Sequence, residues 1–411
     1  MSIFQRAEVL LPRTEDKSTW AVIACDQFTS EPEYWQRVRE RVGEKPSALH
    51  LIFPEAELKV EPERHILAIR EAMADYLARN LLETYPESFV YVERSLSNGT
   101  VRRGLVGQVD LERYDYSPQT DAPVRATERT VVERIPPRMK IREGAPLELP
   151  HVLLLCDDER DAILAPLQAG EGTWLYDFEL MEGGGHIRGR LVTGAEAEAV
   201  TARLDAYERE TAARYTALTH HPMLYAVGDG NHSLATAKAC YEKLKKTIGE
   251  EAASRHPARY ALAELGSLHD ASLQFAPIHR LITGTDPEAL LCAVQSAIGG
   301  EGGAELPWFA GERHGILRLG ESSELPVGML QRFLDDWLPA HGGEIDYIHG
   351  DDTLRRLASR PESLGFLLPP IEKNAFFAGV MAGGVLPRKT FSMGQARDKR
   401  YYLEARKLYN D

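Results

Sequence analysis

The sequence predicts a mixed α/β fold with α+β character, in which β-hairpins and strand–helix units follow one another along the chain. One observation is a glycine-containing turn between an apolar strand at Met223–Val227 and a segment of helical period from Leu234. Two others are the turns Ser97–Thr100 and Gly183–Gly185, each between two strand-like segments, which indicate hairpins. This mixture favours the mixed class over a doubly wound parallel sheet.

The expected strands are short apolar runs, and the expected helices carry apolar residues three or four positions apart. The helix near Pro32 begins with Ser30 and Glu33 at the spacing of a capping box. The other helices are expected at Glu63–Leu82, Ala195–Ala213, from Leu234, and at about Gln395–Leu408. The strands are expected at Trp20–Cys25, Leu49–Phe53, Phe89–Val92, Gly104–Val109, Val152–Cys156, Trp174–Leu180, His186–Val192, Met223–Val227 and Tyr260–Leu265.

The glycine-rich segment Gly299–Gly303 is the strongest candidate for a linker, because glycine runs interrupt regular secondary structure. We therefore expect the chain to divide near this segment. The expected parts are an α/β core at residues 1–300 that holds the turn 228–233, a smaller αβ lobe at 304–360, and a C-terminal segment at 361–411 that returns to the core.

Length and charge limit the class of partner. With 411 residues and 43% apolar content, the chain can bury a large core, and two domains are the natural expectation. A formal net charge of -14 argues against nucleic acid or an anionic membrane as the main partner. A small or phosphorylated anion is a candidate ligand where positive side chains gather locally. The oligomeric state stays open.

The four cysteines, Cys25, Cys156, Cys240 and Cys292, are far apart in the sequence and form no CxxC pair. Each lies in or beside an apolar run, so we expect core thiols in a reducing compartment. The first residues lack the basic and apolar segments of a signal peptide, and no apolar run reaches membrane-spanning length. These features predict a soluble cytoplasmic protein.

The turn Gly228–Ser233, between the strand and the helix, has the features of an anion site. The first backbone N–H groups of a helix have no partner within the helix, and they point outward at the positive end of the helix dipole. Gly228 and Gly230 carry no side chain that would keep a ligand away from the backbone. A turn of this kind that only joins a strand to a helix is the alternative.

The other residues of this turn add chemistry to the backbone. Asn231 or Ser233 can cap the helix or donate a hydrogen bond to an anion. His232 offers an imidazole that transfers protons near neutral pH, and Asp229 offers a carboxylate. If the turn binds no ligand, His232 caps its own helix and Asp229 pairs with a lysine of that helix.

Four segments together resemble the family known as domain of unknown function 1015. They are the Asn-His-Ser motif within Gly228–Ala235, Arg125–Thr130, Leu273–Arg280 and Leu386–Thr390. The family's central motif is in turn similar to the phosphate-binding turn of the ParB/sulfiredoxin-like superfamily, which includes CTP-binding partition proteins, ATP-using sulfiredoxins and archaeal kinases of free serine. The resemblance implies a ParB/sulfiredoxin-like core and a nucleotide phosphate, from ATP, ADP or CTP, on the turn.

The chain departs from the family's usual central motif, Ala-Asp-Gly-His-His-Arg, at two positions. Asn231 replaces the first histidine, and Ser233 replaces the arginine, so the guanidinium that would hold a phosphate at two oxygens is absent from the turn. The backbone N–H groups and the helix dipole remain, and are worth roughly 0.3–2 kcal/mol for an anion. Arg280 and Lys389 are the candidates for a compensating cation, and a structural ion pair is the alternative for each.

Some further residues invite a metal or carboxylate interpretation. Asp26 follows a strand, where a carboxylate can orient a hydroxyl group, bind a metal or cap a helix. Glu128, beside an arginine, is interpreted as part of a structural pair on a strand. His220 and His221 together with His232 suggest a metal site, but the spacing and the missing fourth ligand argue against a closed zinc site.

The leading hypothesis is a nucleotide-dependent phosphotransferase that acts on a small hydroxyl compound. In it, the N–H groups of Gly230–Ser233 contact a phosphate and His232 touches the transferred group. Asp229 orients His232 or binds Mg²⁺, while Arg280 and Lys389 neutralise the developing charge. One alternative is a nucleotide-binding regulatory module without catalysis. The other is a metal-dependent hydrolase built on the three histidines.

Overall fold

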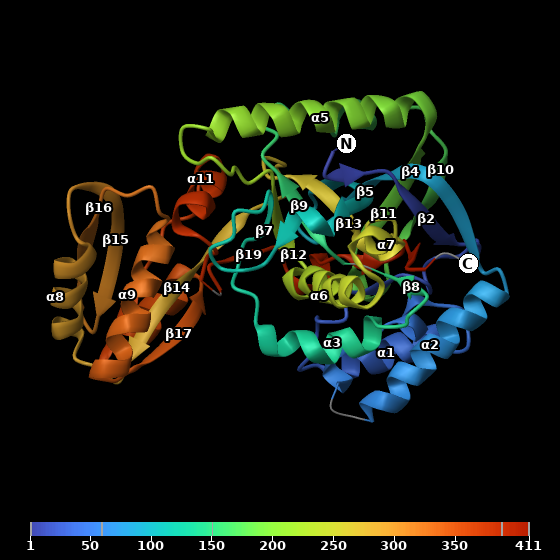
Figure 1. The fold of residues 1–411 in the computed structure, drawn as a ribbon. Helices are drawn as coiled ribbons and strands as arrows, with labels where there is room; N and C mark the ends of the chain where they lie inside the picture. The colour runs from blue at the N-terminus through green and yellow to red at the C-terminus, as the bar shows by residue number, and fades with distance from the viewer. Residues whose placement is uncertain (1, 59–60, 150, 388, 410–411) are drawn as a thin grey trace.

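The computed structural model describes residues 2–58, 61–149, 151–387 and 389–409 and confirms the mixed α/β fold (Figure 1). The described strands form two large sheets, of 11 and 6 strands, and two short pairs. The first sheet runs in the order β10 (Trp174–Glu179), β11 (His186–Val192), β4 (Leu82–Ser95), β5 (Val101–Asp110), β13 (Tyr260–Ser267), β9 (Leu153–Cys156), β12 (Tyr225–Asp229), β7 (Val124–Ala126) and β6 (Tyr114–Asp115), with β1 (Phe4–Gln5) beside β5 and β2 (Ala7–Pro12) beside β4.

Side chains of the first sheet alternate between its two faces, as a strand period of two requires. Val90 and Val106 belong to a core cluster shared with the helices α1 (Pro32–Val42) and α2 (Pro62–Ala78). Their neighbours Tyr91 and Leu105 belong to a second cluster, shared with α5, α6 and α7. These three helices span Gly194–Tyr215, Asn231–Ile248 and Glu250–Ser254, and Figure 1 shows α5 along the side of the sheet opposite to α1 and α2.

The second sheet lies beside the first and is drawn in yellow to red in Figure 1. Its order is β16 (Arg313–Gly320), β15 (Gly302–Ala310), β18 (Ser363–Phe366), β14 (Phe275–Thr283) and β17 (Glu344–His349), with β19 (Phe391–Met393) paired to the start of β14. Its helices are α8 (Pro287–Ile298), α9 (Pro326–His341), α10 (Asp351–Ala358) and α11 (Lys373–Gly383). One apolar cluster contains Leu155 and Ala226 of the first sheet together with Phe376 of α11, so the two sheets share a continuous core.

Short elements complete the chain. The remaining helices are α3 (Ile135–Arg142) and α4 (Ala165–Gln168), and the 3-10 helices are η1 (Ala48–Leu51), η2 (Glu55–Glu57), η3 (Leu111–Arg113), η4 (Val132–Arg134), η5 (Met181–Gly183), η6 (Pro257–Arg259) and η7 (Ala396–Asp398). Two strand pairs tie the C-terminal segment to earlier parts of the chain. They are β20 (Tyr401–Tyr402) with β3 (Val22–Ile23), and β21 (Arg406–Lys407) with β8 (Leu147–Glu148).

Both predicted hairpins are confirmed by antiparallel pairing, β4 with β5 and β10 with β11. The strand–turn–helix unit at β12 and α6 is also confirmed. The predicted strand at Leu49–Phe53 is wrong, because Ser47 caps a 3-10 helix there by accepting a hydrogen bond from the N–H of Leu49. The predicted capping box at Ser30 is wrong as well: α1 begins at Pro32, after Glu31, with proline preset for the first helical position.

Two other expectations need correction. The run Gly299–Gly303 does not separate the sheets, because it joins α8 to β15, and both pack in the second sheet's layers. The chain passes from the first sheet to the second earlier, between β13 and β14. The expected C-terminal helix is replaced by η7, β20 and β21, since consecutive residues of this segment are buried and leave no polar helical face.

The cysteines are all free thiols, but they are not all in the core. Cys156 is buried and Cys25 and Cys240 are half-buried, whereas Cys292 is exposed, contrary to the expectation of core thiols. Cys292 lies on α8, whose buried face is formed by Leu290 and Val294. Separately, within the described ranges of the chain, no helix has both the length and the apolar character needed to cross a membrane.

Candidate functional site

The turn between β12 and α6 has the geometry of an open helix N-terminus. β12 ends at Asp229, Gly230 adopts a left-handed conformation with φ 79° and ψ 26°, and α6 begins at Asn231. A Cβ atom on Gly230 would lie 3.0 Å from the Cα of Val152, so both the conformation and the space require glycine. The N-cap residue Gly230 has no side chain that could cap this helix, and its own N–H donates to Asp229 Oδ1 at 3.0 Å.

The turn opens into a polar cavity of about 300 Å³. All the residues predicted for the site line this cavity except Arg280. The lining residues that were predicted from the sequence are Gly228, Asp229, Gly230, Asn231, His232, Ser233 and Lys389. Asp26, a candidate carboxylate in the sequence, lines the cavity as well. The further residues are Glu55, Glu128, Arg129, Arg134, Arg138, His151, Phe391 and Lys399.

The cationic side chains of the cavity outnumber its carboxylates. Arg138 pairs with Glu55, and the Lys399 Nζ lies 3.3 Å from Asp229 Oδ2. Arg129 and Arg134, both exposed at the cavity wall, have no carboxylate partner among the described residues. Unpaired positive charge beside an open helix N-terminus attracts an anion.

Lys389 reaches the cavity because the chain after α11 returns to the first sheet. The carbonyl of Leu386 accepts from the N–H of Arg129, and the N–H of Leu386 donates to the carbonyl of Thr127. This pairing brings Lys389 beside Glu128 at the cavity wall. The Nζ of Lys389 lies 5.0 Å from the ring centroid of Tyr347, which belongs to β17 of the second sheet. Both sheets therefore contribute to the site.

Glu128 is the most unusual ionisable group of the cavity. Burial raises the pKa of its carboxyl to about 7, and the neighbouring Asp229 adds to the rise. A hydrogen bond from the N–H of Thr390 and the charges of Lys399 and Arg280 oppose it. A carboxyl that titrates near neutral pH is suited to accept a proton, so its interpretation as a structural pair is incomplete.

Asp26 behaves in the opposite way. Burial raises the pKa of its carboxyl, but His151, a hydrogen bond from Gln27 and the charge of Lys399 outweigh that effect and lower the pKa below its ordinary value. The His151 Nε2 lies 3.8 Å from Asp26 Oδ2. Asp26 is therefore a permanent carboxylate at the cavity, whereas Glu128 can exchange its proton.

Two side chains of the turn have defined surroundings. The Nε2 of His232 accepts a hydrogen bond of 3.1 Å from the N–H of Val131, which ties the turn to η4 and so to Arg134. An accepting Nε2 places the proton of the neutral ring on Nδ1. The Oδ1 of Asn231 is buried and has no hydrogen-bond partner among the described residues, so a ligand donor would satisfy it.

Arg280 lies behind the cavity, in β14, and its side chain is fully buried. Its Nη1 donates to the carbonyl of Lys389 at 3.0 Å, and its Nε donates to Gln331 Oε1 at 2.6 Å. Burial lowers the pKa of this guanidinium to about 10. Lys389 has a left-handed backbone with φ 55°, so Arg280 supports a strained segment and reaches the site through it.

The three histidines proposed for a metal site are not together. His220 and His221 precede β12 and His232 follows it, and a strand of this length separates its ends by roughly 13 Å. In the described parts of the chain, the one group with metal-ligand spacing is Asp157, Glu159 and His269. The Oδ2 of Asp157 in this group already accepts a hydrogen bond of 2.8 Å from the guanidinium of Arg214.

Fold and cavity together define a mixed α/β protein with a polar cavity, lined by several cationic side chains, where a strand meets a helix. The chain belongs to the family described as Protein of unknown function (DUF1015), whose model matches residues 9–407. The resemblance of the sequence to this family is thus confirmed over nearly the whole chain. No match to a curated protein was found.

Three solved structures resemble the chain at low identity. A conserved hypothetical protein from Pyrococcus furiosus is 11% identical, with a TM-score of 0.33 over 74% of this chain and 94% of that one. A variant of free serine kinase in complex with ADP is 12% identical, with a TM-score of 0.35 over 73% and 91%. A C-terminally truncated SbnI from Staphylococcus aureus is 10% identical, with a TM-score of 0.34 over 70% and 82%. Similarity at this level does not bear on function.

Proposed function

We propose that the protein transfers the terminal phosphoryl group of a nucleotide to the hydroxyl group of a small compound, in the cavity at the start of α6. The observation that carries the proposal is the cavity itself. It joins an open helix N-terminus to two unpaired guanidinium groups, those of Arg129 and Arg134, and to Glu128, whose carboxyl has a pKa of about 7. The similarity of the turn to the phosphate-binding motif of the ParB/sulfiredoxin-like superfamily also supports a nucleotide phosphate at this position.

The phosphates of the nucleotide bind at the turn. The N–H groups of Asn231 and Ser233, in the first turn of α6, donate to phosphate oxygens, whereas the N–H of Gly230 already donates to Asp229 Oδ1. The amide nitrogen of Asn231 is a further donor. Arg129 and Arg134 supply guanidinium groups in place of the single one that the family motif carries within the turn and that this chain lacks there.

The chemical step then needs a base and charge stabilisation. The hydroxyl oxygen of the acceptor attacks the terminal phosphorus, the bond from phosphorus to the nucleotide's bridging oxygen breaks, and the hydroxyl proton passes to Glu128. Lys389 and Lys399 stabilise the charge that develops on the transferred group. We assign His232 to holding η4 and Arg134 in place, since its Nε2 already accepts from Val131.

The carboxylates of the cavity suit Mg²⁺. This ion binds proteins through one or two carboxylates and takes its other ligands from water and substrate phosphates. Asp229 and Asp26 are the carboxylates that would hold it, and the low pKa of Asp26 keeps that group ionised. The ion would neutralise phosphate charge, whereas in the structure Lys399 is the cation paired with Asp229.

A nucleotide-binding module without transfer is the second candidate. It is favoured by one observation, the presence of Asn231 and Ser233 where the family motif has histidine and arginine. Such a module would use the same phosphate contacts and would change conformation or partner on binding. The structure disfavours the hydrolase alternative, because β12 separates its histidines.

The test has two stages. Thermal shift and calorimetry with ATP, ADP, CTP and pyrophosphate, each with Mg²⁺, measure binding, since a ligand of the native state raises its stability. The double variant Arg129→Ala, Arg134→Ala should lose about tenfold or more in affinity, whereas Arg360→Ala, at an exposed arginine outside the cavity, should not.

In the second stage, ³¹P NMR follows nucleotide and a panel of hydroxyl compounds with the protein. A phosphorylated acceptor that depends on Glu128 supports the transferase. Nucleotide binding without such a product indicates the module, and absence of nucleotide binding overturns both.

A further inference from the structure

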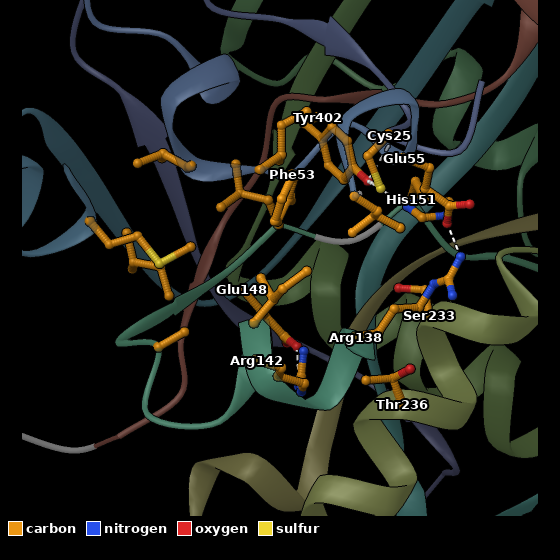
Figure 2. Close-up of a pocket in the computed structure, with 18 residues that line it drawn as sticks. Cys25, Phe53, Glu55, Arg138, Arg142, Glu148, His151, Ser233, Thr236 and Tyr402 are labelled. Atoms are coloured by element: carbon orange, nitrogen blue, oxygen red, sulfur yellow. Dashed lines mark hydrogen bonds and ion pairs between the residues drawn. The ribbon is translucent and has the colours of Figure 1, made fainter. Parts of the chain in front are cut away.

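Beside the phosphate cavity lies a second hollow of about 140 Å³, shown in Figure 2. Its walls are mainly apolar and come from several separate parts of the chain. Leu51 and Phe53 lie in and after η1, Met73 on α2, Ile141 on α3, and Leu147 on β8. Buried apolar walls around an unfilled space are the usual lining of a site for an apolar or aromatic group.

The two hollows adjoin. Glu55, Arg138, His151 and Ser233 line both of them, and Ser233 is in the first turn of α6. Figure 2 shows Arg138, His151 and Ser233 grouped on one side of the apolar hollow. A ligand with its phosphates on the N-terminus of α6 therefore has an apolar space next to it.

The hollow also carries a few polar groups that hold their positions. The carboxylate of Glu148 is only 3% exposed and is fixed by Arg142, by the N–H of Leu262 at 2.9 Å and by the Nε of Arg406 at 2.8 Å. Glu148, Arg142 and Thr236 all line the hollow. Apolar walls suit the faces of a planar ring, and fixed polar groups suit the donors and acceptors on its edge.

Size decides what the hollow can hold. Sites for whole drug-sized ligands have volumes of roughly 300–1,000 Å³. The apolar hollow is about half the lower limit, so it holds a part of a ligand, while the adjoining polar cavity of about 300 Å³ takes the rest.

We propose that the apolar hollow lined by Phe53, Met73 and Leu147 is the nucleobase site of this protein, with the phosphates of the same nucleotide at the start of α6. The inference rests on the proposed function, because it takes the phosphate position from it. It adds which part of the chain recognises the base. It also separates this ligand from pyrophosphate or a simple sugar phosphate, neither of which has a ring to bury.

The experiment compares pyrophosphate with ADP, GDP, CDP and UDP by calorimetry at several temperatures. Pyrophosphate reports the phosphate contacts alone. At least one nucleoside diphosphate should bind about tenfold or more tightly than pyrophosphate and with a more negative heat-capacity change, which marks the burial of apolar surface.

A variant then locates the effect. Ala145 is 2% exposed and lines the hollow, so Ala145→Leu places extra carbon atoms in it. The affinity of the variant for the nucleoside diphosphate should fall toward its affinity for pyrophosphate. The affinity for pyrophosphate should stay within about twofold of that of the unmodified protein. Ala258→Leu is the matched control, because Ala258 lines a separate hollow of about 160 Å³, and it should change neither affinity.

The outcomes distinguish the two proposals. Pyrophosphate binding with no tighter nucleotide overturns the base site and leaves the phosphate site standing. The same holds if a nucleotide binds tightly but Ala145→Leu weakens it no more than Ala258→Leu. Absence of binding by every probe overturns the proposed function and this inference together. If Ala145→Leu does not fold, the heat-capacity comparison on the unmodified protein decides.

Discussion

Replacing Glu128 by glutamine should change how the stability of the protein depends on pH. Burial raises the pKa of the Glu128 carboxyl from 4.5 to about 7, so the folded state holds this proton more tightly than the unfolded state does. The stabilisation is therefore fully present below about pH 4.5 and is lost as the pH rises through about 7. Glutamine has nearly the same shape and cannot ionise, so Glu128→Gln removes this loss.

The magnitude follows from the gap between the two pKa values. A gap of about 2.5 units corresponds to about 3 kcal/mol, at about 1.36 kcal/mol per unit. Glu128 is only half-buried at the cavity wall, and solvent screening reduces the effect to about 1–3 kcal/mol. Between about pH 5 and about pH 8, the variant should gain this amount of stability relative to the unmodified protein.

Urea denaturation followed by tryptophan fluorescence measures the free energy of unfolding of both proteins across this range. Groups that titrate equally in both proteins cancel in the difference. Glu71→Gln, at an exposed position on α2, controls for the substitution itself. If the difference in free energy of unfolding between the two proteins does not change with pH, or if the variant becomes relatively less stable as the pH rises, the reasoning about Glu128 is refuted.

Three other outcomes are expected. Gly230→Ala should destabilise the protein by about 1–3 kcal/mol in thermal denaturation, because alanine resists a φ of 79° and its Cβ meets a neighbouring backbone atom at 3.0 Å. Gly311 has a similar φ of 64°, but a Cβ there would meet no atom within 4 Å, so Gly311→Ala should reduce stability less. Equal losses of stability in the two variants would contradict the role of crowding at Gly230. Arg280→Lys should weaken pyrophosphate binding severalfold by releasing the carbonyl of Lys389, and unchanged affinity would show that this support is unnecessary. Raising the salt concentration from about 0.05 to 0.5 M should weaken pyrophosphate binding about tenfold, because the cations are exposed and screened, and salt-independent binding would argue against an electrostatic site.

The turn of the site is predictable from the sequence because its signals are local. The change from a strand run to a helical period on either side of Gly228–Ser233 defines a strand–turn–helix unit within about 25 residues. Arg134, His151 and Lys399 reach the same cavity from distant parts of the chain, and only the tertiary fold brings them together. Glu128 was within a recognised segment, but its raised pKa depends on burial, which a sequence does not show.

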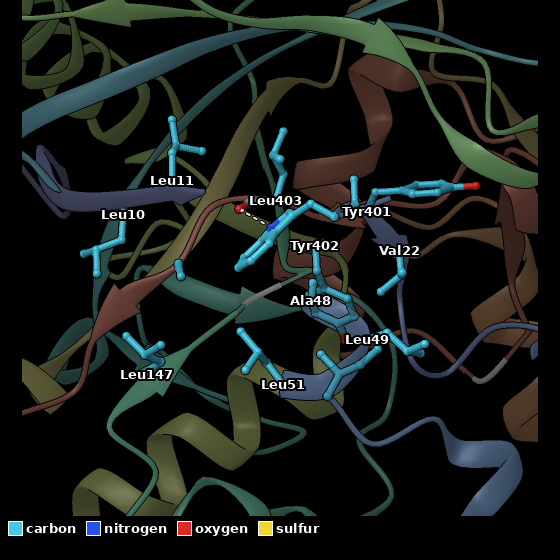
Figure 3. Packing of buried hydrophobic residues seen from close by; sticks show 14 of the residues in the cluster. Leu10, Leu11, Val22, Ala48, Leu49, Leu51, Leu147, Tyr401, Tyr402 and Leu403 are labelled. Carbon is cyan, nitrogen blue, oxygen red and sulfur yellow. Dashed lines mark hydrogen bonds between the residues drawn. The ribbon is translucent and has the colours of Figure 1, made fainter. Parts of the chain in front are cut away.

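The C-terminal segment shows how tertiary contacts replace a local preference. Tyr401, Tyr402 and Leu403 are consecutive and all buried, so every side of the segment faces protein (Figure 3). The carbonyl of Leu403 accepts from the indole N–H of Trp20 at 3.2 Å, and Tyr401 pairs with Ile23. An extended chain satisfies these contacts on both sides, whereas a helix would expose part of this apolar surface.

Arg280 explains why the missing cation of the turn could not be located from the sequence. Serine at position 233 leaves the turn without the arginine of the family motif, and the sequence pointed to Arg280 and Lys389, not to Arg129, as the compensating cation. Arg280 is in a strand with neighbours on both sides, where its Nε donates to Gln331 Oε1 and its Nη1 donates to the carbonyl of Lys389. Arg129 follows a strand of only three residues and stays at the open cavity wall. The buried Arg280 therefore supports the segment that crosses between the sheets, whereas the exposed Arg129 is the arginine to which the proposed function assigns the phosphate.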